Sequence, residues 1–96
     1  MRLSVEEIAS IKRIVAATFG CDTEVRLFGS RVDDSKRGGD VDLYVMPTQR
    51  DELYMKRITC LGELERVLPY PVDLVVAEPE AGRPIDRIAL KTGVPL

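Results

Sequence analysis

Asp40 and Asp42 are two aspartates separated by one residue, and they follow a Gly-Ser pair at Gly29 and Ser30. In an extended strand alternate side chains leave the same face, so both carboxylates are predicted to project together while their apolar neighbours pack into the core. Two adjacent carboxylates repel each other unless a cation lies between them. Because carboxylate oxygens without nearby His or Cys suit hard ions, the pair predicts Mg²⁺ or Mn²⁺, and not zinc, in a site for phosphate transfer.

Other residues nearby have side chains that suit the same chemistry. Gly29 lets the backbone approach a phosphate closely, and the Ser30 hydroxyl with nearby amide N–H groups can bind phosphate oxygens. Arg31 adds a cationic contact. Asp73 completes the site if its strand lies beside the strand of the paired aspartates.

The composition indicates one small domain over residues 1–96, because a chain of 96 residues buries one core and little more. The net charge of −2 and the pI near 5.1 argue against direct binding of long nucleic acid, whereas a nucleotide with its metal is compatible with them. Cys21 and Cys60 are too few for a disulfide framework and are expected to be packed thiols. With neither an apolar secretory stretch nor ~20 consecutive apolar residues, we expect a cytoplasmic protein without membrane contact.

Hydrophobic periodicity and capping residues predict alternating helices and strands. Ser4 and Glu7 have the spacing of a capping box at the start of a first helix, which Gly20 is placed to end. The later helix over residues 50–68 is predicted from an apolar stripe of Leu53, Ile58, Leu61, Leu64 and Leu68. The remaining expected elements are strands over 24–28, 40–46 and 72–77, a short helix from Pro84 to residue 90 or 91, and an edge strand over 94–96.

The lengths of the connections predict how the strands pair. Only eleven residues separate Phe28 from Asp40, which is short for a parallel crossover, so the first two strands are expected to be antiparallel neighbours. The helix over 50–68 is long enough to form a crossover to the third strand. A mixed three- to four-stranded sheet with packed helices follows, which is an α/β or α+β fold.

The motifs in this order resemble a known family over nearly the whole chain. The segments GS at 29–30, GDVDL at 39–43 and VDLV at 72–75, each flanked by the expected helices and strands, are similar to the polymerase-beta-type nucleotidyltransferase core. The chain resembles its minimal form, the MNT domain. The resemblance implies that the Gly-Ser element contacts the phosphates of a nucleotide such as ATP, and that three carboxylates hold two divalent ions. Carried over, these roles fall on Ser30, Asp40, Asp42 and Asp73.

The resemblance also implies a partner. Minimal proteins of this kind are commonly paired with a helical HEPN-type RNase in toxin–antitoxin modules, where the transferase adds AMP to a tyrosine hydroxyl of the toxin. Larger relatives carry a further domain that presents the acceptor, and 96 residues leave no room for one. Three interpretations stay open: an antitoxin that transfers AMP to its partner, an antitoxin that only occludes its partner, and a transferase acting on a small molecule.

Each candidate residue also has an interpretation without chemistry. Asp40 can cap a turn, and Asp42 or Asp73 can face solvent on an edge strand. Gly29 and Ser30 can form an ordinary turn, and the mixed charges at 33–37 can be a solvated loop. The combined order of the motifs favours the metal site over these alternatives. With no His in the chain, a Ser/His or Cys/His mechanism has no base.

Overall fold

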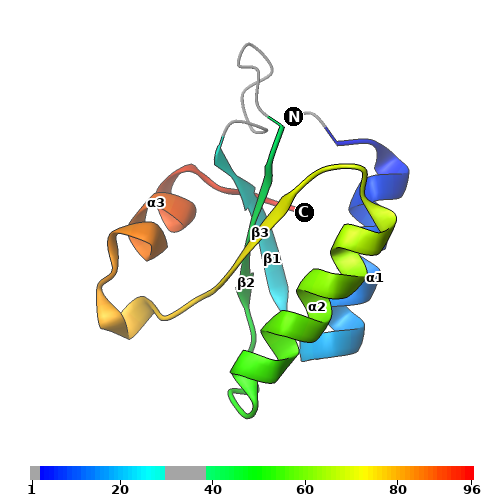
Figure 1. Ribbon diagram of the computed structural model, residues 1–96. Coiled ribbons are helices and arrows are strands. Elements are labelled where there is room, and N and C mark those ends of the chain that lie inside the picture. The colour runs from blue at the N-terminus through cyan, green and yellow to red at the C-terminus, as the bar shows by residue number, and fades with distance from the viewer. Residues whose placement is uncertain (1–2, 30–38) are drawn as a thin grey trace.

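The computed structural model describes residues 3–29 and 39–96, which form an α+β fold with helices on both faces of a mixed sheet (Figure 1). This described part contains three α-helices, one 3₁₀ turn and four strands. In chain order they are α1 (Val5–Phe19), β1 (Glu24–Phe28), β2 (Val41–Met46), α2 (Leu53–Val67), β3 (Val72–Val76), the 3₁₀ turn η2 (Pro79–Ala81), α3 (Pro84–Thr92) and β4 (Val94–Pro95). None of the described helices has the length and apolar character needed to cross a membrane.

Helix α1 begins and ends where its capping residues predict. The Ser4 hydroxyl accepts a hydrogen bond from the Glu7 backbone N–H at 3.0 Å, and the Glu7 carboxylate accepts one from the Ser4 backbone N–H at 2.8 Å. Both halves of the capping box are therefore present. Gly20 ends the helix with a φ of 121°, a conformation that L side chains rarely adopt. The buried residues of α1 are Ile11, Ile14, Val15 and Phe19.

Helix α2 starts three residues later than the sequence predicts, at Leu53. Glu52 has a φ of 56°, outside the right-handed helical region, so the helix cannot extend back through it. The predicted apolar stripe is wrong at Ile58, which is 44% exposed, whereas Cys60 and Leu64 are buried. Because Cys60 and Leu64 are four residues apart, they share the face that packs against the core, and Ile58 is turned away from it.

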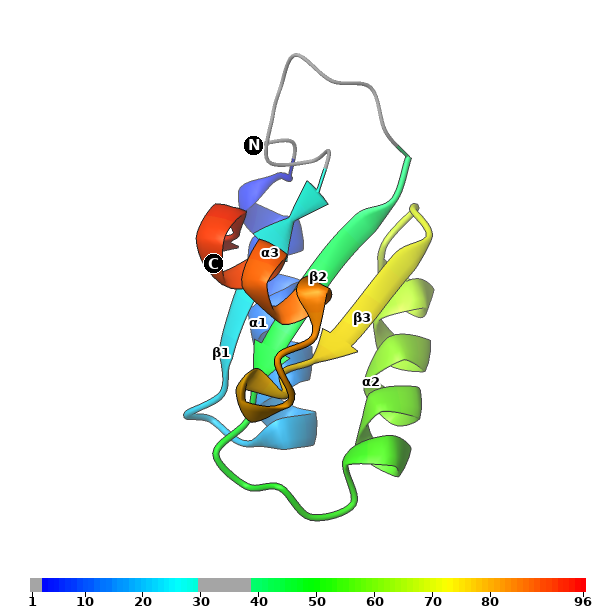
Figure 2. The same cartoon turned by 90° about the vertical axis from the view of Figure 1, so that its left-hand side faces the viewer.

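The strand pairing agrees with the connection lengths. The strand order is β3-β2-β1-β4, with β1 antiparallel to β2 and β2 parallel to β3 after the crossover through α2. Figure 2 shows β1, β2 and β3 side by side in this order. The short strand β4 pairs with β1, as expected for a terminal edge strand. The other edge of the sheet is β3.

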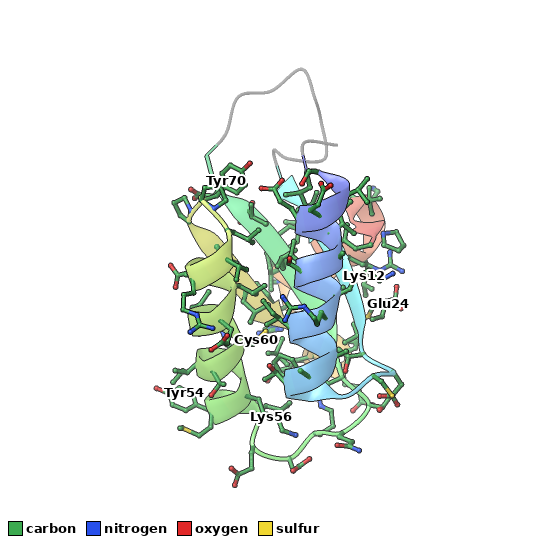
Figure 3. All side chains as sticks on the ribbon, turned by 90° about the vertical axis from the view of Figure 1, so that its right-hand side faces the viewer. Lys12, Glu24, Tyr54, Lys56, Cys60 and Tyr70 are labelled. Carbon is green, nitrogen blue, oxygen red and sulfur yellow. The ribbon has the colours of Figure 1, made fainter. Side chains whose placement is uncertain are left out.

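The two faces of the sheet are covered differently. Helices α1 and α2 lie side by side over one face, where they form the main core with Val41, Leu43 and Val45 of β2 (Figure 3). Helix α3 lies on the other face and contributes to a smaller cluster that contains Tyr44 of β2. Side chains alternate along a strand, so Asp42 shares the α3 face with Tyr44. Helix α3 packs mainly on β1, which leaves the β3 side of this face open among the described elements.

The two cysteines have different environments. Cys60 is fully buried between α2 and α1, and burial raises the pKa of its thiol to about 11 despite a hydrogen bond with Thr18. It therefore stays protonated at neutral pH, as expected for a packed thiol. The same expectation is wrong for Cys21, which is exposed because it follows the end of α1 in a turn.

Candidate active site

Strand β1 ends, and strands β2 and β3 begin, at the same end of the sheet (Figure 1). The three candidate aspartates lie at this end. Asp42 of β2 is directly beside Asp73 of β3 in the parallel register, and Phe28 of β1 is opposite Asp42. Adjacent strands are about 4.8 Å apart, so two carboxylates on the same face of neighbouring strands lie close together. Asp40 comes just before β2; it and Asp73 are exposed, and Asp42 is half-buried.

The electrostatics of Asp42 reflect this arrangement. Burial raises the pKa of the Asp42 carboxyl above its ordinary value, and the charges of Asp73 and then Asp40 raise it further. None of the ion pairs among residues 3–29 and 39–96 involves any of these three carboxylates. The described residues therefore leave a concentration of negative charge that a cation would relieve.

Gly29 lies against the Asp42 carboxylate. Its φ is 79°, and a Cβ at this position would collide with the carboxylate oxygen of Asp42. The sequence predicts Gly29 as a point of close backbone approach to a phosphate, and the structure adds a second reason for glycine. Only glycine combines the positive φ with the space that the Asp42 side chain occupies.

We expect Gly29→Ala to lower the free energy of unfolding by about 1–3 kcal/mol, because alanine is strained at this φ and its Cβ displaces Asp42. Urea unfolding followed by circular dichroism measures the effect. Gly39→Ala is the matched control, since a Cβ there meets no atom within 4 Å. Equal stability of the two variants would show that the Gly29 backbone is not constrained by Asp42.

Two of the predicted phosphate-binding residues, Ser30 and Arg31, lie outside the described residues, as does the mixed-charge segment 33–37. Their roles stay predictions. Gly29 is the last described residue before this segment and Gly39 the first after it. Both flank the cluster of aspartates.

The donor set at this end fits a hard divalent cation. Asp40, Asp42 and Asp73 provide only carboxylate oxygens, the ligands that Mg²⁺ and Mn²⁺ favour. No group of three or more Asp, Glu, His or Cys side chains within the described ranges is close enough together to hold an ion as it stands. Asp40 and Asp73 are exposed, however, and exposed side chains change rotamer easily, so they can turn toward an ion at Asp42.

A buried charged network on the same face was not predicted from the sequence. Asp86 of α3 is only 2% exposed, and its carboxylate accepts hydrogen bonds from the Tyr44 hydroxyl at 2.6 Å, the Glu78 backbone N–H at 2.9 Å and the Arg83 Nε at 2.7 Å. These bonds hold the pKa of Asp86 far below its usual range, and the bond from Arg83 has the largest effect. Burial and then the Asp86 contact raise the pKa of Tyr44 to about 12.

This network fixes α3 to the sheet close to the aspartates. Tyr44 is two residues after Asp42 on the same face of β2, so the bond from Tyr44 to Asp86 joins α3 to the strand that carries Asp42. The sequence offers one weak signal, an arginine and an aspartate three residues apart around Pro84 at the start of a helix. An aspartate in the first turn of a helix is usually exposed, so this spacing does not predict burial.

Comparisons with known proteins show the family to which the chain belongs. A search of curated proteins finds no match to the chain. A family model described as "Nucleotidyltransferase domain" matches residues 8–93. The matched region includes all three aspartates, Gly29 and the described elements from the first turns of α1 to the end of α3. Because the match covers most of its length, the chain belongs to the nucleotidyltransferase domain family.

Proposed function

We propose that this protein transfers AMP from ATP to a tyrosine hydroxyl of a HEPN-type helical toxin partner and thereby acts as an antitoxin. The observation that carries the transferase assignment is the register that puts Asp42 beside Asp73, with Asp40 close enough to raise the pKa of Asp42. The family membership supports a nucleoside triphosphate as the donor. The choice of AMP, of the tyrosine acceptor and of the toxin rests on the resemblance to minimal nucleotidyltransferases.

In this proposal each residue has a distinct task. Asp40, Asp42 and Asp73 hold two Mg²⁺ ions, which when bound supply a lowered pKa for the acceptor hydroxyl and neutralise the phosphates. Gly29 brings the backbone close to the triphosphate, and Ser30 and Arg31 bind its oxygens. The acceptor oxygen then attacks the α-phosphorus, and the bond from this phosphorus to the oxygen that bridges it to the β-phosphate breaks. Pyrophosphate leaves with that oxygen, and the proton of the acceptor hydroxyl is released to solvent.

The open face around Asp73 favours a large acceptor. Asp73 is exposed, and among the described elements α3 packs over β1 and leaves the β3 side of this face uncovered. Transfer requires the acceptor to be held in line with the α-phosphate and water to be excluded. A partner protein that covers this face would do both.

The direct test is the intact mass of a co-expressed toxin partner after incubation with this protein, Mg²⁺ and each of the four nucleoside triphosphates. We expect a mass gain of one AMP, found on a tyrosine by peptide mapping, with ATP preferred. Rapid transfer to a small hydroxyl compound without any mass gain on the partner would refute the antitoxin proposal. Inhibition of the toxin without any transfer would support the occluding antitoxin instead.

A variant at the third carboxylate separates binding from chemistry. We expect Asp73→Asn to lower the rate of transfer by about 100-fold or more while changing the Kd of Mg²⁺–ATP only a few-fold, because Asp73 stabilises the transition state more than bound nucleotide. Single-turnover kinetics and calorimetry measure the two quantities. Unchanged transfer in this variant would make Asp73 a surface residue without a role in the reaction.

A further inference from the structure

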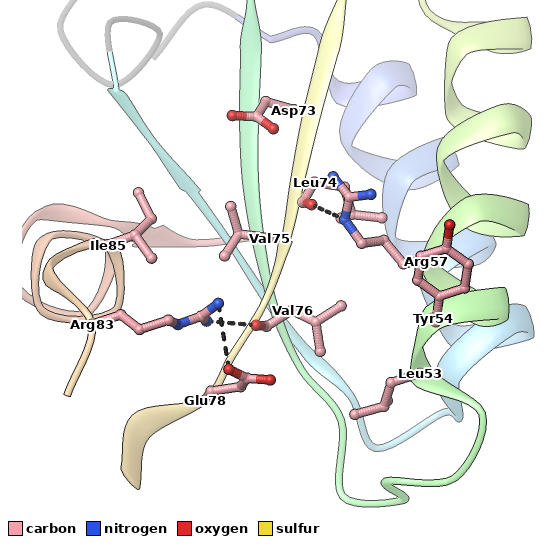
Figure 4. A pocket seen from close by; sticks show the side chains of 10 residues that line it. All are labelled: Leu53, Tyr54, Arg57, Asp73, Leu74, Val75, Val76, Glu78, Arg83 and Ile85. Carbon is pink, nitrogen blue, oxygen red and sulfur yellow. Dashed lines mark hydrogen bonds and ion pairs between the residues drawn. The ribbon is translucent and has the colours of Figure 1, made fainter. Parts of the chain in front are cut away.

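A groove runs along the outer edge of β3, between α2 on one side and the segment from Glu78 to α3 on the other (Figure 4). Its volume is about 410 Å³, and Asp73 is one of its lining residues. Apolar side chains from three elements form its walls: Leu53 of α2, Val75 of β3 and Ile85 of α3. The groove therefore begins at Asp73, a candidate metal ligand, and leads away from Asp40 and Asp42.

Two arginines enter this groove, and they differ in how fully they are bonded. Arg83 donates to Asp86 through Nε and to the Val76 carbonyl at 2.9 Å, and it pairs with Glu78 at 3.5 Å (Figure 4). All of its nitrogens are therefore engaged. Arg57 of α2 donates only through Nε, to the Leu74 carbonyl at 2.8 Å. Within the part of the chain that the structure describes, its two terminal nitrogens have no partner and it makes no ion pair.

The bond to Leu74 places the Arg57 guanidinium beside the residue that directly follows Asp73 (Figure 4). With Nε held by a backbone carbonyl, the planar group is oriented and presents its remaining N–H donors as a fork. Such a fork matches the two oxygens of a carboxylate. Among the described residues that line the groove, the acidic side chains are Asp73 and Glu78, and Glu78 already pairs with Arg83. Of the two arginines in this described lining, Arg57 is thus the one available to a ligand.

The order of the strands indicates which ligand this is. Gly29 directly follows β1, Asp42 is on β2, which lies between β1 and β3, and Asp73 is on the edge strand β3. A nucleotide bound at the Gly29 side would place its phosphates near Asp42. The acceptor must approach the α-phosphate from the opposite side, which is the edge where the groove lies.

We propose that this groove binds the acceptor, and that Arg57 selects an acceptor polypeptide with an acidic residue near its reactive hydroxyl. This proposal rests on the proposed nucleotidyl transfer, and it adds which class of acceptor the site prefers. The acidic carboxylate pairs with the Arg57 fork, apolar atoms of the segment contact Leu53 and Ile85, and the hydroxyl lies toward Asp73. Arg57 is a specificity-determining residue in this scheme.

The test uses two short capped peptides as probes, Glu-Ala-Tyr-Ala and Lys-Ala-Tyr-Ala, with binding to the full chain followed by NMR titration. We expect the acidic peptide to bind about tenfold more tightly than the basic one, the size of one charge-assisted interaction. Arg57→Gln should remove this preference, and Arg57→Lys should keep only part of it because a lysine lacks the fork. Arg66→Gln is the matched control on the same helix, since Arg66 is exposed and pairs with Glu63.

The outcomes separate this inference from the proposed function. Equal binding of the two peptides, or an equal loss in the Arg57→Gln and Arg66→Gln variants, would overturn the role of Arg57. Inorganic phosphate that binds Arg57 as tightly as the acidic peptide would make the groove a simple anion site and would also overturn it. Calorimetry with Mg²⁺–ATP is run in parallel: a peptide preference without ATP binding would refute nucleotidyl transfer while leaving the acidic-peptide site at Arg57 in place.

Discussion

Replacing both paired aspartates, in the variant Asp40→Asn/Asp42→Asn, is expected to reduce nucleotidyl transfer by more than about 100-fold. The two carboxylates are the predicted ligands of both metal ions, and asparagine amides neither carry the charge nor bridge two cations. The same variant should lose most of its affinity for Mg²⁺–ATP. Calorimetry with Mg²⁺–ATP and the intact-mass assay measure these effects.

The same substitution should raise the stability of the metal-free protein. The folded-state pKa of Asp42 is raised, so the folded protein binds this proton more tightly than the unfolded chain does. Stability from Asp42 is therefore highest below its ordinary pKa and falls as the pH rises through the raised value. The ionised carboxylate is in an unfavourable setting because of burial and the charges of Asp73 and Asp40, and the neutral amide avoids this cost. Thermal unfolding should show the variant melting higher without Mg²⁺, and the gain should shrink at acidic pH.

A control is available in Asp51, an exposed aspartate that pairs with Lys56 at the start of α2 and lies away from the groove and the three aspartates. Asp51→Asn should change neither transfer nor the response of stability to Mg²⁺, because an exposed ion pair contributes little. If the double variant still bound Mg²⁺–ATP with unchanged affinity and transferred normally, the metal site would have to be elsewhere.

The largest loss of stability is expected at Asp86. Asp86→Ala removes the carboxylate that accepts hydrogen bonds from Tyr44, Arg83 and the Glu78 backbone, and it leaves the partly buried Arg83 without this partner. Breaking a buried charged pair by removing one partner costs about 3–5 kcal/mol. Such a loss is a large fraction of the ~5–15 kcal/mol that typically holds a domain folded. Urea unfolding at neutral pH measures it.

The pH dependence of this contribution has a defined sign. The pKa of Asp86 is lowered in the folded state, so its stabilising effect is present above its ordinary pKa and is lost as the pH falls toward the folded value. Tyr44 acts in the other direction: its stabilising bond is present below pH 10 and is lost as the pH rises toward its pKa of about 12. The difference in stability between wild type and Asp86→Ala should therefore be largest at neutral pH, disappear toward the acidic extreme, and decrease in part as the pH rises toward 12.

A second pair of variants keeps this prediction open to test if Asp86→Ala does not fold. Tyr44→Phe removes one hydrogen bond to Asp86 and should cost about 1 kcal/mol. Asp86→Leu combined with Arg83→Met replaces the ion pair with apolar groups and should cost less than Asp86→Ala, since no buried charge loses its partner and the Glu78 carboxylate that also pairs with Arg83 is exposed. A cost below 1 kcal/mol for Asp86→Ala would mean that solvent, and not Asp86, satisfies Arg83.

The sequence alone predicted most of the local structure and proposed the residues of the candidate site. The capping box at Ser4 and the glycine at Gly20 mark α1 because caps involve residues three or four apart, which are visible in a linear sequence. The short connection between the first two strands predicted antiparallel pairing, and the helix before β3 predicted the parallel crossover. Because side chains alternate between the two faces of a strand, the sequence predicted that Asp42 lies on the face opposite the main core.

The tertiary structure alone decided which of these residues meet. Three contacts join residues that are far apart in the chain. Asp42 lies beside Asp73 in the register of the strands, Gly29 contacts Asp42, and Asp86 of α3 is buried against Tyr44 of β2. No local period encodes such pairs, because they depend on how whole elements dock. The groove at Arg57 has the same origin: it exists because β3 is an edge strand, and the position of a strand in a sheet is set by the packing of all the others.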